Sequence, residues 1–222
     1  MELSNSVREE NIMRAIIFCW SERDILPIEI KKDDYVICAD VGIDYALRCG
    51  VKPNLAIGDF DSFDKGRLTN LNFEIITIKE EKDETDTHYA VMLALQKGYT
   101  EIILCGGIGG RLDHTLANIS TLKHIYESGG KGHITDGITV VYFMTDGSYM
   151  DLPFNKKCKY VSLWAMKDSE NVTIEGLKYK LDKATLTTNF PIGTSNEFIE
   201  GKDGRISIGK GEILVILTMK NI

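Results

Sequence analysis

A change of rhythm near the middle of the sequence restricts the fold more than any other feature. Up to about residue 130, short apolar runs alternate with helical segments, and beyond that point short strand-like runs follow one another with only turn residues between them. Alternating strands and helices predict βαβ units and a mostly parallel sheet, whereas closely spaced strands predict a sandwich or barrel. We therefore expect an α/β protein in two parts, residues 1–133 and 134–222, with the boundary near residues 130–137.

The expected elements follow from these runs. Strands are predicted where apolar runs are bounded by turn residues, and helices where apolar residues recur every three to four positions. In the first part the predicted strands are 15–20, 35–39, 55–57, 73–78 and 101–105, and the predicted helices are 43–49, 89–96 and 113–126. In the second part the predicted strands are 139–144, 160–165, 172–174, 186–189, 205–208 and 213–219.

Charge and composition exclude several classes of protein. The chain of 222 residues has a formal net charge of −7, which disfavours a general binder of nucleic acids or anionic membranes. No apolar run approaches the roughly 18 residues of a membrane span, and the first residues do not resemble a signal peptide. The five cysteines form no Cys-x-x-Cys pair, so we expect reduced thiols, with Cys19, Cys38 and Cys105 buried. These features predict a cytoplasmic enzyme or binding protein.

Three aspartates lie just after short apolar runs. Asp40 follows one run, and Asp59 and Asp61 follow the next, separated from each other by one residue. Open α/β sheets present their ligands at the carboxyl ends of the strands, and Mg²⁺ binds one or two carboxylates together with substrate phosphates. These aspartates are therefore candidate metal ligands. The structural alternative, a solvated turn with Asp61 or Ser62 capping a helix, is favoured when the pair is taken alone.

An acidic segment, Lys82-Asp83-Glu84-Thr85-Asp86, precedes the second predicted helix. Asp83 or Thr85 is a suitable N-cap, because a side-chain oxygen there accepts a hydrogen bond from the first turn. Capping does not explain Asp86, which is the fourth candidate metal ligand. Lys82 can pair with a phosphate, although an exposed lysine among acids is usually only solvated.

A glycine-rich turn, residues 106–110, lies between a predicted strand and a predicted helix. Such a turn directs backbone N–H groups and a helix N-terminus at an anion, and Arg111 adds a guanidinium suited to phosphate oxygens. The spacing matches neither the Walker A pattern nor the dinucleotide fingerprint. Asp113 is a possible cap for the helix, and for His114 we favour a packed histidine over a catalytic one.

The segment 193–198 is a polar turn that does not by itself indicate a binding site. No nucleophile–base pair stands out anywhere in the sequence. The repeated theme is carboxylates together with a phosphate-binding turn, which points to metal-assisted phosphoryl chemistry.

Taken together, these stretches resemble the thiamine pyrophosphokinase family. The matching segments are ADVG at 39–42, KPNLAIGDFDS at 52–62, KDETD at 82–86, GGRLDH at 109–114, GLKY at 176–179 and TSNE at 194–197. They occur in the family's order and span most of the chain. The Gly-Asp-Phe-Asp-Ser and Gly-Gly-Arg-x-Asp-His segments are highly specific in combination.

The resemblance implies a Rossmann-like α/β/α nucleotide-binding domain followed by a β-sandwich domain that binds thiamine. It also implies transfer of an intact pyrophosphoryl group from ATP to the hydroxyl of thiamine, with Mg²⁺ as cofactor and AMP released, in a homodimer with the active site at its interface. Carried over by motif, the Mg²⁺ carboxylates are Asp40, Asp59, Asp61 and Asp86, and the nucleotide-binding residues are Asp40, Lys82, Thr85, Gly109, Gly110, Arg111 and Asp113. The residues expected to act in catalysis are Asp59, Asp61, Asp86 and Arg111, and those expected to contact thiamine are Ser195, Asn196 and Phe198.

The sequence departs from the family's pattern at two places. Residues 19–22 (CWSE) stand where the family often has Asn-Gly after the first strand, and Val41 stands where it favours glycine. Valine disfavours a positive φ, so either the turn does not require one at Val41 or its shape differs. Two rival functions remain: a pyrophosphokinase acting on a hydroxymethylpterin, and a catalytically silent sensor of nucleotide or thiamine.

Overall fold

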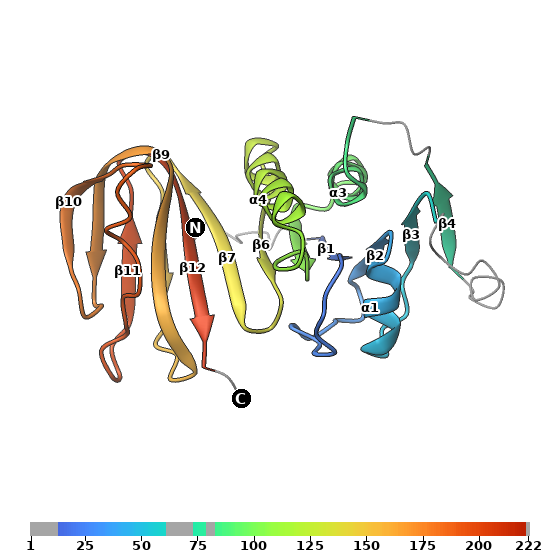
Figure 1. Cartoon of the computed structure of the whole chain (residues 1–222), viewed down its shortest axis with the longest axis horizontal. Helices are drawn as coiled ribbons and strands as arrows, with labels where there is room; N and C mark the ends of the chain where they lie inside the picture. Colours follow the sequence, from blue (N-terminus) through green and yellow to red (C-terminus); the bar gives the residue numbers. More distant parts are fainter. Residues whose placement is uncertain (1–12, 61–72, 79–82, 221–222) are drawn as a thin grey trace, which may run out of the picture.

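The computed structural model describes residues 13–60, 73–78 and 83–220. The strands in these ranges form one 12-stranded mixed sheet in the order β4-β3-β2-β1-β5-β6-β7-β12-β9-β11-β8, with β10 paired to β9. Figure 1 shows the parallel strands and the helices at one end of an elongated molecule and the antiparallel strands at the other.

The bounds of the elements follow the chain order. The first part contains β1 (Arg14–Phe18), β2 (Tyr35–Ala39), α1 (Gly42–Arg48), β3 (Leu55–Gly58), β4 (Glu74–Thr77), α3 (Asp86–Gln96), β5 (Glu101–Cys105), α4 (Leu112–Glu127) and β6 (Lys131–Thr135). The second part contains β7 (Thr139–Thr145), β8 (Tyr149–Leu152), β9 (Cys158–Glu175), β10 (Leu181–Leu186), β11 (Gly204–Ser207) and β12 (Lys210–Met219).

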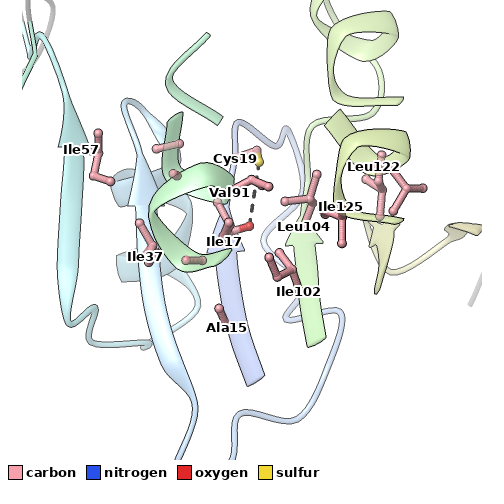
Figure 2. Packing of buried hydrophobic residues seen from close by; sticks show 14 of the residues in the cluster. Ala15, Ile17, Cys19, Ile37, Ile57, Val91, Ile102, Leu104, Leu122 and Ile125 are labelled. Carbon is pink, nitrogen blue, oxygen red and sulfur yellow. Dashed lines mark hydrogen bonds between the residues drawn. The ribbon is translucent and has the colours of Figure 1, made fainter. Parts of the chain in front are cut away.

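Strands β1 to β6 pair in parallel, as the alternation of strands and helices predicts. The central strands are apolar on both faces because helices cover both sides of the sheet. On one face, α3 and α4 pack over the side chains drawn in Figure 2, among them Ile17, Val91, Leu104 and Leu122. On the other face, α1 covers a second cluster that includes Phe18 and Tyr45. Each such fully buried side chain contributes about 1.5–3 kcal/mol to folding.

The second part is antiparallel and is built around the long strand β9. The first segment of β9 pairs with β12, and its last residues pair with β10 and β11. One face of these strands buries a third apolar cluster, which includes Leu163, Val172, Ile206 and Val215. Alternation of buried and exposed residues along β9 produces this one-sided burial.

Strand β6 joins the two parts into one sheet, because it pairs in parallel with β5 and antiparallel with β7. The sequence did not predict β6 or the short strand β8, and it divided β9 into two strands, 160–165 and 172–174. The run KGHIT of β6 is neither strongly apolar nor alternating. Its extended form depends on pairing on both sides, and Gly132 lies so close to Ile102 that a Cβ there would sit 1.8 Å from the Ile102 carbonyl oxygen.

All five cysteines are free thiols, and Cys19, Cys38 and Cys105 are buried, as predicted. Among the described residues, none of the helices has both the length and the apolar character needed to cross a membrane.

Candidate active site

Two of the predicted aspartates follow adjacent strands at the carboxyl edge of the parallel strands. Asp40 follows β2 and Asp59 follows β3, and the pairing of Ala39 with Ile57 sets Asp40 beside Gly58. The backbone N–H of Asp40 donates to the Ile57 carbonyl oxygen at 2.7 Å. A Cβ on Gly58 would lie only 3.1 Å from the Asp40 Cα, so the glycine allows the two strand ends to approach closely.

The turn after β2 explains the departure at Val41. Asp40 has the positive φ, 46°, while Val41 has a φ of −60° and serves as the N-cap residue of α1. Aspartate tolerates the left-handed region far better than a β-branched residue does. The turn therefore needs no glycine at position 41, and the left-handed conformation falls on the candidate ligand itself.

The start of α3 lies over the end of β1 at the same edge. Thr85 is the N-cap residue, and its Oγ1 accepts a hydrogen bond from the His88 N–H at 3.2 Å, which confirms the capping prediction. Asp86 is the first residue of the helix, and the hydroxyl of the next residue, Thr87, donates to the Cys19 Sγ at 3.5 Å. The helix N-terminus, which favours negative charge nearby, therefore opens onto the edge where Asp40 and Asp59 lie.

The glycine-rich turn after β5 also reaches this edge. Gly106, Gly107, Gly109 and Gly110 all have positive φ, which accounts for four glycines in five positions. Arg111 follows them as the N-cap residue of α4, and its Nε and Nη2 donate to the two carboxylate oxygens of Asp113 at 3.2 and 2.6 Å. The hydrogen bond from Arg111 lowers the pKa of Asp113 below its ordinary value. Both side chains are exposed, so the guanidinium is held in one orientation while its other N–H groups face solvent.

His114 differs from the prediction. It is exposed at the first turn of α4 rather than packed, because the buried face of this helix begins only at Asn118. The Asn118 side-chain amide donates to the Gly107 carbonyl oxygen at 2.9 Å and fixes the glycine-rich turn to the helix.

The loop after β1, where the sequence departs from the family, contributes a residue that was not among the predicted site residues. The Trp20 indole covers Gly110, where a Cβ would lie 2.5 Å from Cη2, and the residue is 38% exposed. The only signal in the sequence that could have drawn attention to this loop is that residues 19–22 differ from the Asn-Gly common in the family.

Three of the four aspartates that the sequence predicts as metal ligands lie within the described residues. Asp40, Asp59 and Asp86 offer carboxylate oxygens, the donors that Mg²⁺ prefers, while Asp61 and Lys82 lie outside the described residues. In the ranges that the structure describes, no group of three or more His, Cys, Asp or Glu side chains is close enough together to hold a metal. Mg²⁺ often takes only one or two protein carboxylates and completes its coordination with phosphates and water, so a cluster of three is not required.

The predicted thiamine segment forms a turn beside β9. Asn196 bridges to Val161 of β9, and its side chain is turned inward and only 4% exposed. Its Oδ1 accepts from the Tyr179 and Glu197 N–H groups, both at 2.9 Å, and its Nδ2 donates to the Tyr179 carbonyl oxygen at 2.6 Å. Asn196 thus clamps the 176–179 segment to the turn, while Ser195 is exposed with a φ of 60°.

Phe198 lies at the far end of the same turn. Its ring meets Phe154 edge to face at 5.9 Å, and both rings line a hollow of about 400 Å³. Tyr160 and the side chains of Lys156, Lys159 and Lys220 line the same hollow.

Family models match both parts of the chain. The model for "Thiamin pyrophosphokinase, catalytic domain" matches residues 26–131, and the model for "Thiamin pyrophosphokinase, vitamin B1 binding domain" matches residues 149–213. Thiamine pyrophosphokinase from Bacillus subtilis is 30% identical over 184 residues, which cover 81% of this chain and 85% of that protein. The chain belongs to the thiamine pyrophosphokinase family.

Solved structures of the family share the fold. Thiamine pyrophosphokinase from Bacillus subtilis superposes with a TM-score of 0.84 at 24% identity over 94% of this chain and 100% of that one. A thiamin pyrophosphokinase family protein from Enterococcus faecalis gives 0.82 at 27% identity, with 94% and 100% covered. The family consists of ATP-dependent diphosphotransferases that transfer pyrophosphate from ATP to thiamine.

Proposed function

We propose that this chain transfers pyrophosphate from ATP to thiamine at the carboxyl edge of its parallel strands. One observation carries the proposal: Asp40, Asp59, Asp86 and Arg111 come from four separate strand or helix ends that open onto this single edge. In an open α/β sheet this edge is where ligands bind. A sensor of thiamine or nucleotide would not need this set of acids beside a phosphate-binding turn.

Asp40 and Asp59, with Asp61 and Asp86, are the residues proposed to hold Mg²⁺. When bound, the ion would neutralise the triphosphate and lower the cost of charge that develops during transfer. Arg111 would contribute a fixed positive charge to the same phosphates, since Asp113 already orients its guanidinium. Lys82, Thr85, Gly109 and Gly110 complete the proposed nucleotide site through side-chain or backbone donors.

The transfer is an in-line displacement at the β-phosphorus of ATP. The hydroxyl oxygen of thiamine forms a bond to that phosphorus, and the bond from the β-phosphorus to the oxygen of the α-phosphate breaks, so that AMP leaves with that oxygen. The hydroxyl proton passes to a carboxylate of the edge, for which Asp86 is the candidate. The protein mainly positions these groups, as in other phosphoryl transfers.

The second part of the chain is proposed to bind thiamine, with Ser195 at the vitamin, Asn196 holding the segment in shape and Phe198 stacking on the ligand. This assignment divides the chain into a Rossmann-like nucleotide-binding domain and a β-sandwich thiamine-binding domain. Strands β2 and β9 are separated by six strand spacings in the sheet, or about 29 Å. We infer that the two halves of one active site come from two subunits of a homodimer.

Product analysis tests the function. Incubation with ATP, Mg²⁺ and thiamine is expected to give AMP together with thiamine diphosphate. When a hydroxymethylpterin replaces thiamine, no AMP is expected. Formation of ADP, or turnover only with the pterin, would reject the proposal.

Mixing of variants tests the shared site. D59N disables the nucleotide half and S195W blocks the thiamine half, so each variant alone should be inactive. Random exchange of subunits should restore about a quarter of the wild-type activity, because half of the dimers then contain one intact site. No recovery after proven exchange would place each whole site within one chain.

A further inference from the structure

The backbone around Trp20 is held by hydrogen bonds on both sides, although the residue itself is partly exposed. The N–H of Cys19, the preceding residue, donates to the Cys105 carbonyl oxygen at 2.8 Å, and the carbonyl oxygen of Trp20 accepts from the Gly107 N–H at 2.7 Å. The carbonyl oxygen of Ser21, the following residue, accepts from Arg48 Nη2 at 2.9 Å. The backbone on both sides of the ring is therefore anchored to neighbouring elements, and the indole has little freedom to leave the edge.

The glycine-rich turn is shaped to this ring. A Cβ on Gly110 would lie 2.5 and 2.6 Å from two atoms of the six-membered ring, closer than any real contact. Gly110 has a φ of 58°, which by itself favours glycine, and the lack of a Cβ also leaves room for the indole of Trp20, a residue that remains 38% exposed. An aromatic ring that is both fixed and open to solvent is suited to stacking on a flat ligand, since little conformational entropy is lost when the ligand binds.

The neighbouring charge selects the kind of ligand. Arg111 follows Gly110 directly, is exposed and is paired with Asp113 through Nε and Nη2, so its remaining N–H groups are donors that face solvent. These N–H groups can donate to the oxygens of an anion such as a phosphate, whereas the thiazolium of thiamine offers them no comparable acceptor. ATP combines a neutral, flat purine with an anionic triphosphate, which matches an indole and a guanidinium on adjacent structure.

We propose that the Trp20 indole stacks on the adenine of ATP and contributes to the choice and positioning of the nucleotide. The proposal rests on the proposed ATP site and names the residue that holds its base. Stacking of a base on an aromatic side chain changes affinity about 5- to 150-fold when the ring is removed.

Fluorescence gives a direct test, because the chain contains only two tryptophans, Trp20 and Trp164. In the W164F variant all tryptophan emission comes from Trp20, and we expect AMP to quench it saturably. Inorganic tripolyphosphate should compete with AMP without quenching. The matched W20F variant, which keeps only Trp164 on β9, should show no quenching by AMP.

Kinetics provide a second readout. W20L should raise KM for ATP about 5- to 150-fold and leave KM for thiamine within twofold, whereas W20F, which keeps an aromatic ring, should stay within a few-fold of wild type. Thermal unfolding of W20L controls for loss of fold. If W20L does not fold, the quenching result for W164F decides alone.

Three results would overturn the proposal. The first is tryptophan emission of W164F that does not change when AMP is added at concentrations that inhibit turnover. The second is a rise in KM for thiamine, instead of KM for ATP, in W20L. Emission that changes on dilution of the protein but not with AMP would assign the ring to an interface between copies. Thiamine-dependent AMP formation without quenching would reject only the role of Trp20, whereas ADP formation would reject the proposed function itself.

Discussion

Removal of the Asn196 amide should destabilise the second part of the chain and separate the structural role of this residue from thiamine binding. The amide makes three hydrogen bonds of 2.6 to 2.9 Å and is 4% exposed. N196A removes all three, which leaves the N–H groups of Tyr179 and Glu197 and the carbonyl oxygen of Tyr179 without these hydrogen bonds. At a net of about 0.5–1.5 kcal/mol for each of the three hydrogen bonds, the expected loss in unfolding free energy is about 1.5–4.5 kcal/mol.

The neighbouring S195A variant is the matched control. Ser195 is exposed, so S195A should change the unfolding free energy by less than about 0.5 kcal/mol while raising KM for thiamine. Urea unfolding can be followed through Trp164, which lies on β9 in the same part of the chain. In a W20F background Trp164 is the sole tryptophan.

The isosteric variant N196D adds a pH dependence of known sign. Its new carboxylate oxygen would replace the Nδ2 that now lies 2.6 Å from the Tyr179 carbonyl oxygen. Only the protonated acid can donate there, so the folded state should raise the pKa of the introduced carboxyl group above its ordinary value of about 3.9. The hydrogen bond is then fully present below that ordinary pKa and is lost as the pH rises through the raised pKa. The unfolding free energy of N196D should therefore approach that of wild type near pH 4 and fall furthest below it at about pH 7. If the unfolding free energies of N196A and N196D at neutral pH both lie within about 0.5 kcal/mol of the wild-type value, Asn196 does not hold the 176–179 segment to the turn.

Three further predictions concern the nucleotide edge and the sheet. D59N should lower kcat by about 10²–10³-fold while circular dichroism and the unfolding midpoint stay near wild type, and normal turnover in D59N would remove Asp59 from the metal site. T85A should lose about 1 kcal/mol of unfolding free energy, because the N-cap hydrogen bond to the His88 N–H is lost, whereas T85S should retain it. Burial lowers the pKa of His133 to about 4. The stability that comes from burying the neutral imidazole is therefore fully present above the ordinary pKa of about 6.5. It is lost as the pH falls toward 4, where the unfolding free energy drops by up to about 3 kcal/mol. H133F should therefore unfold less readily in acid than wild type, and equal acid sensitivity of the two proteins would contradict this assignment.

The local signals that predicted the parallel strands were strong. Strands β2 and β5 match the predicted bounds because their apolar runs are buried on both faces and end at turn residues. Strand β6 was missed because pairing on both sides, rather than its own sequence, makes it extended. Strand β9 was divided in the prediction because its middle residues 167–171 are polar, although the chain continues through a register shift there.

The positions of the candidate residues in the fold were predictable where they depended on strand ends and not where they depended on packing. Asp40 and Asp59 follow from the rule that ligands bind at the carboxyl ends of parallel strands, and Thr85 follows from cap chemistry. The inward rotation of Asn196 could not be predicted, since a polar residue in a turn is usually exposed. The contact between the Trp20 indole and Gly110 joins two loops that are far apart in sequence, so no local sequence pattern could predict it.

Transfer of label from ATP tests the central claim most directly. ATP labelled on both the β- and γ-phosphorus is incubated with Mg²⁺ and thiamine, and the products are separated. Both labels are expected to reach thiamine diphosphate as one intact group, with one unlabelled AMP formed for each product, and D59N is expected to lower the rate of this transfer by about 10²–10³-fold. Label recovered in ADP, or thiamine diphosphate that contains only the γ label, would contradict this claim.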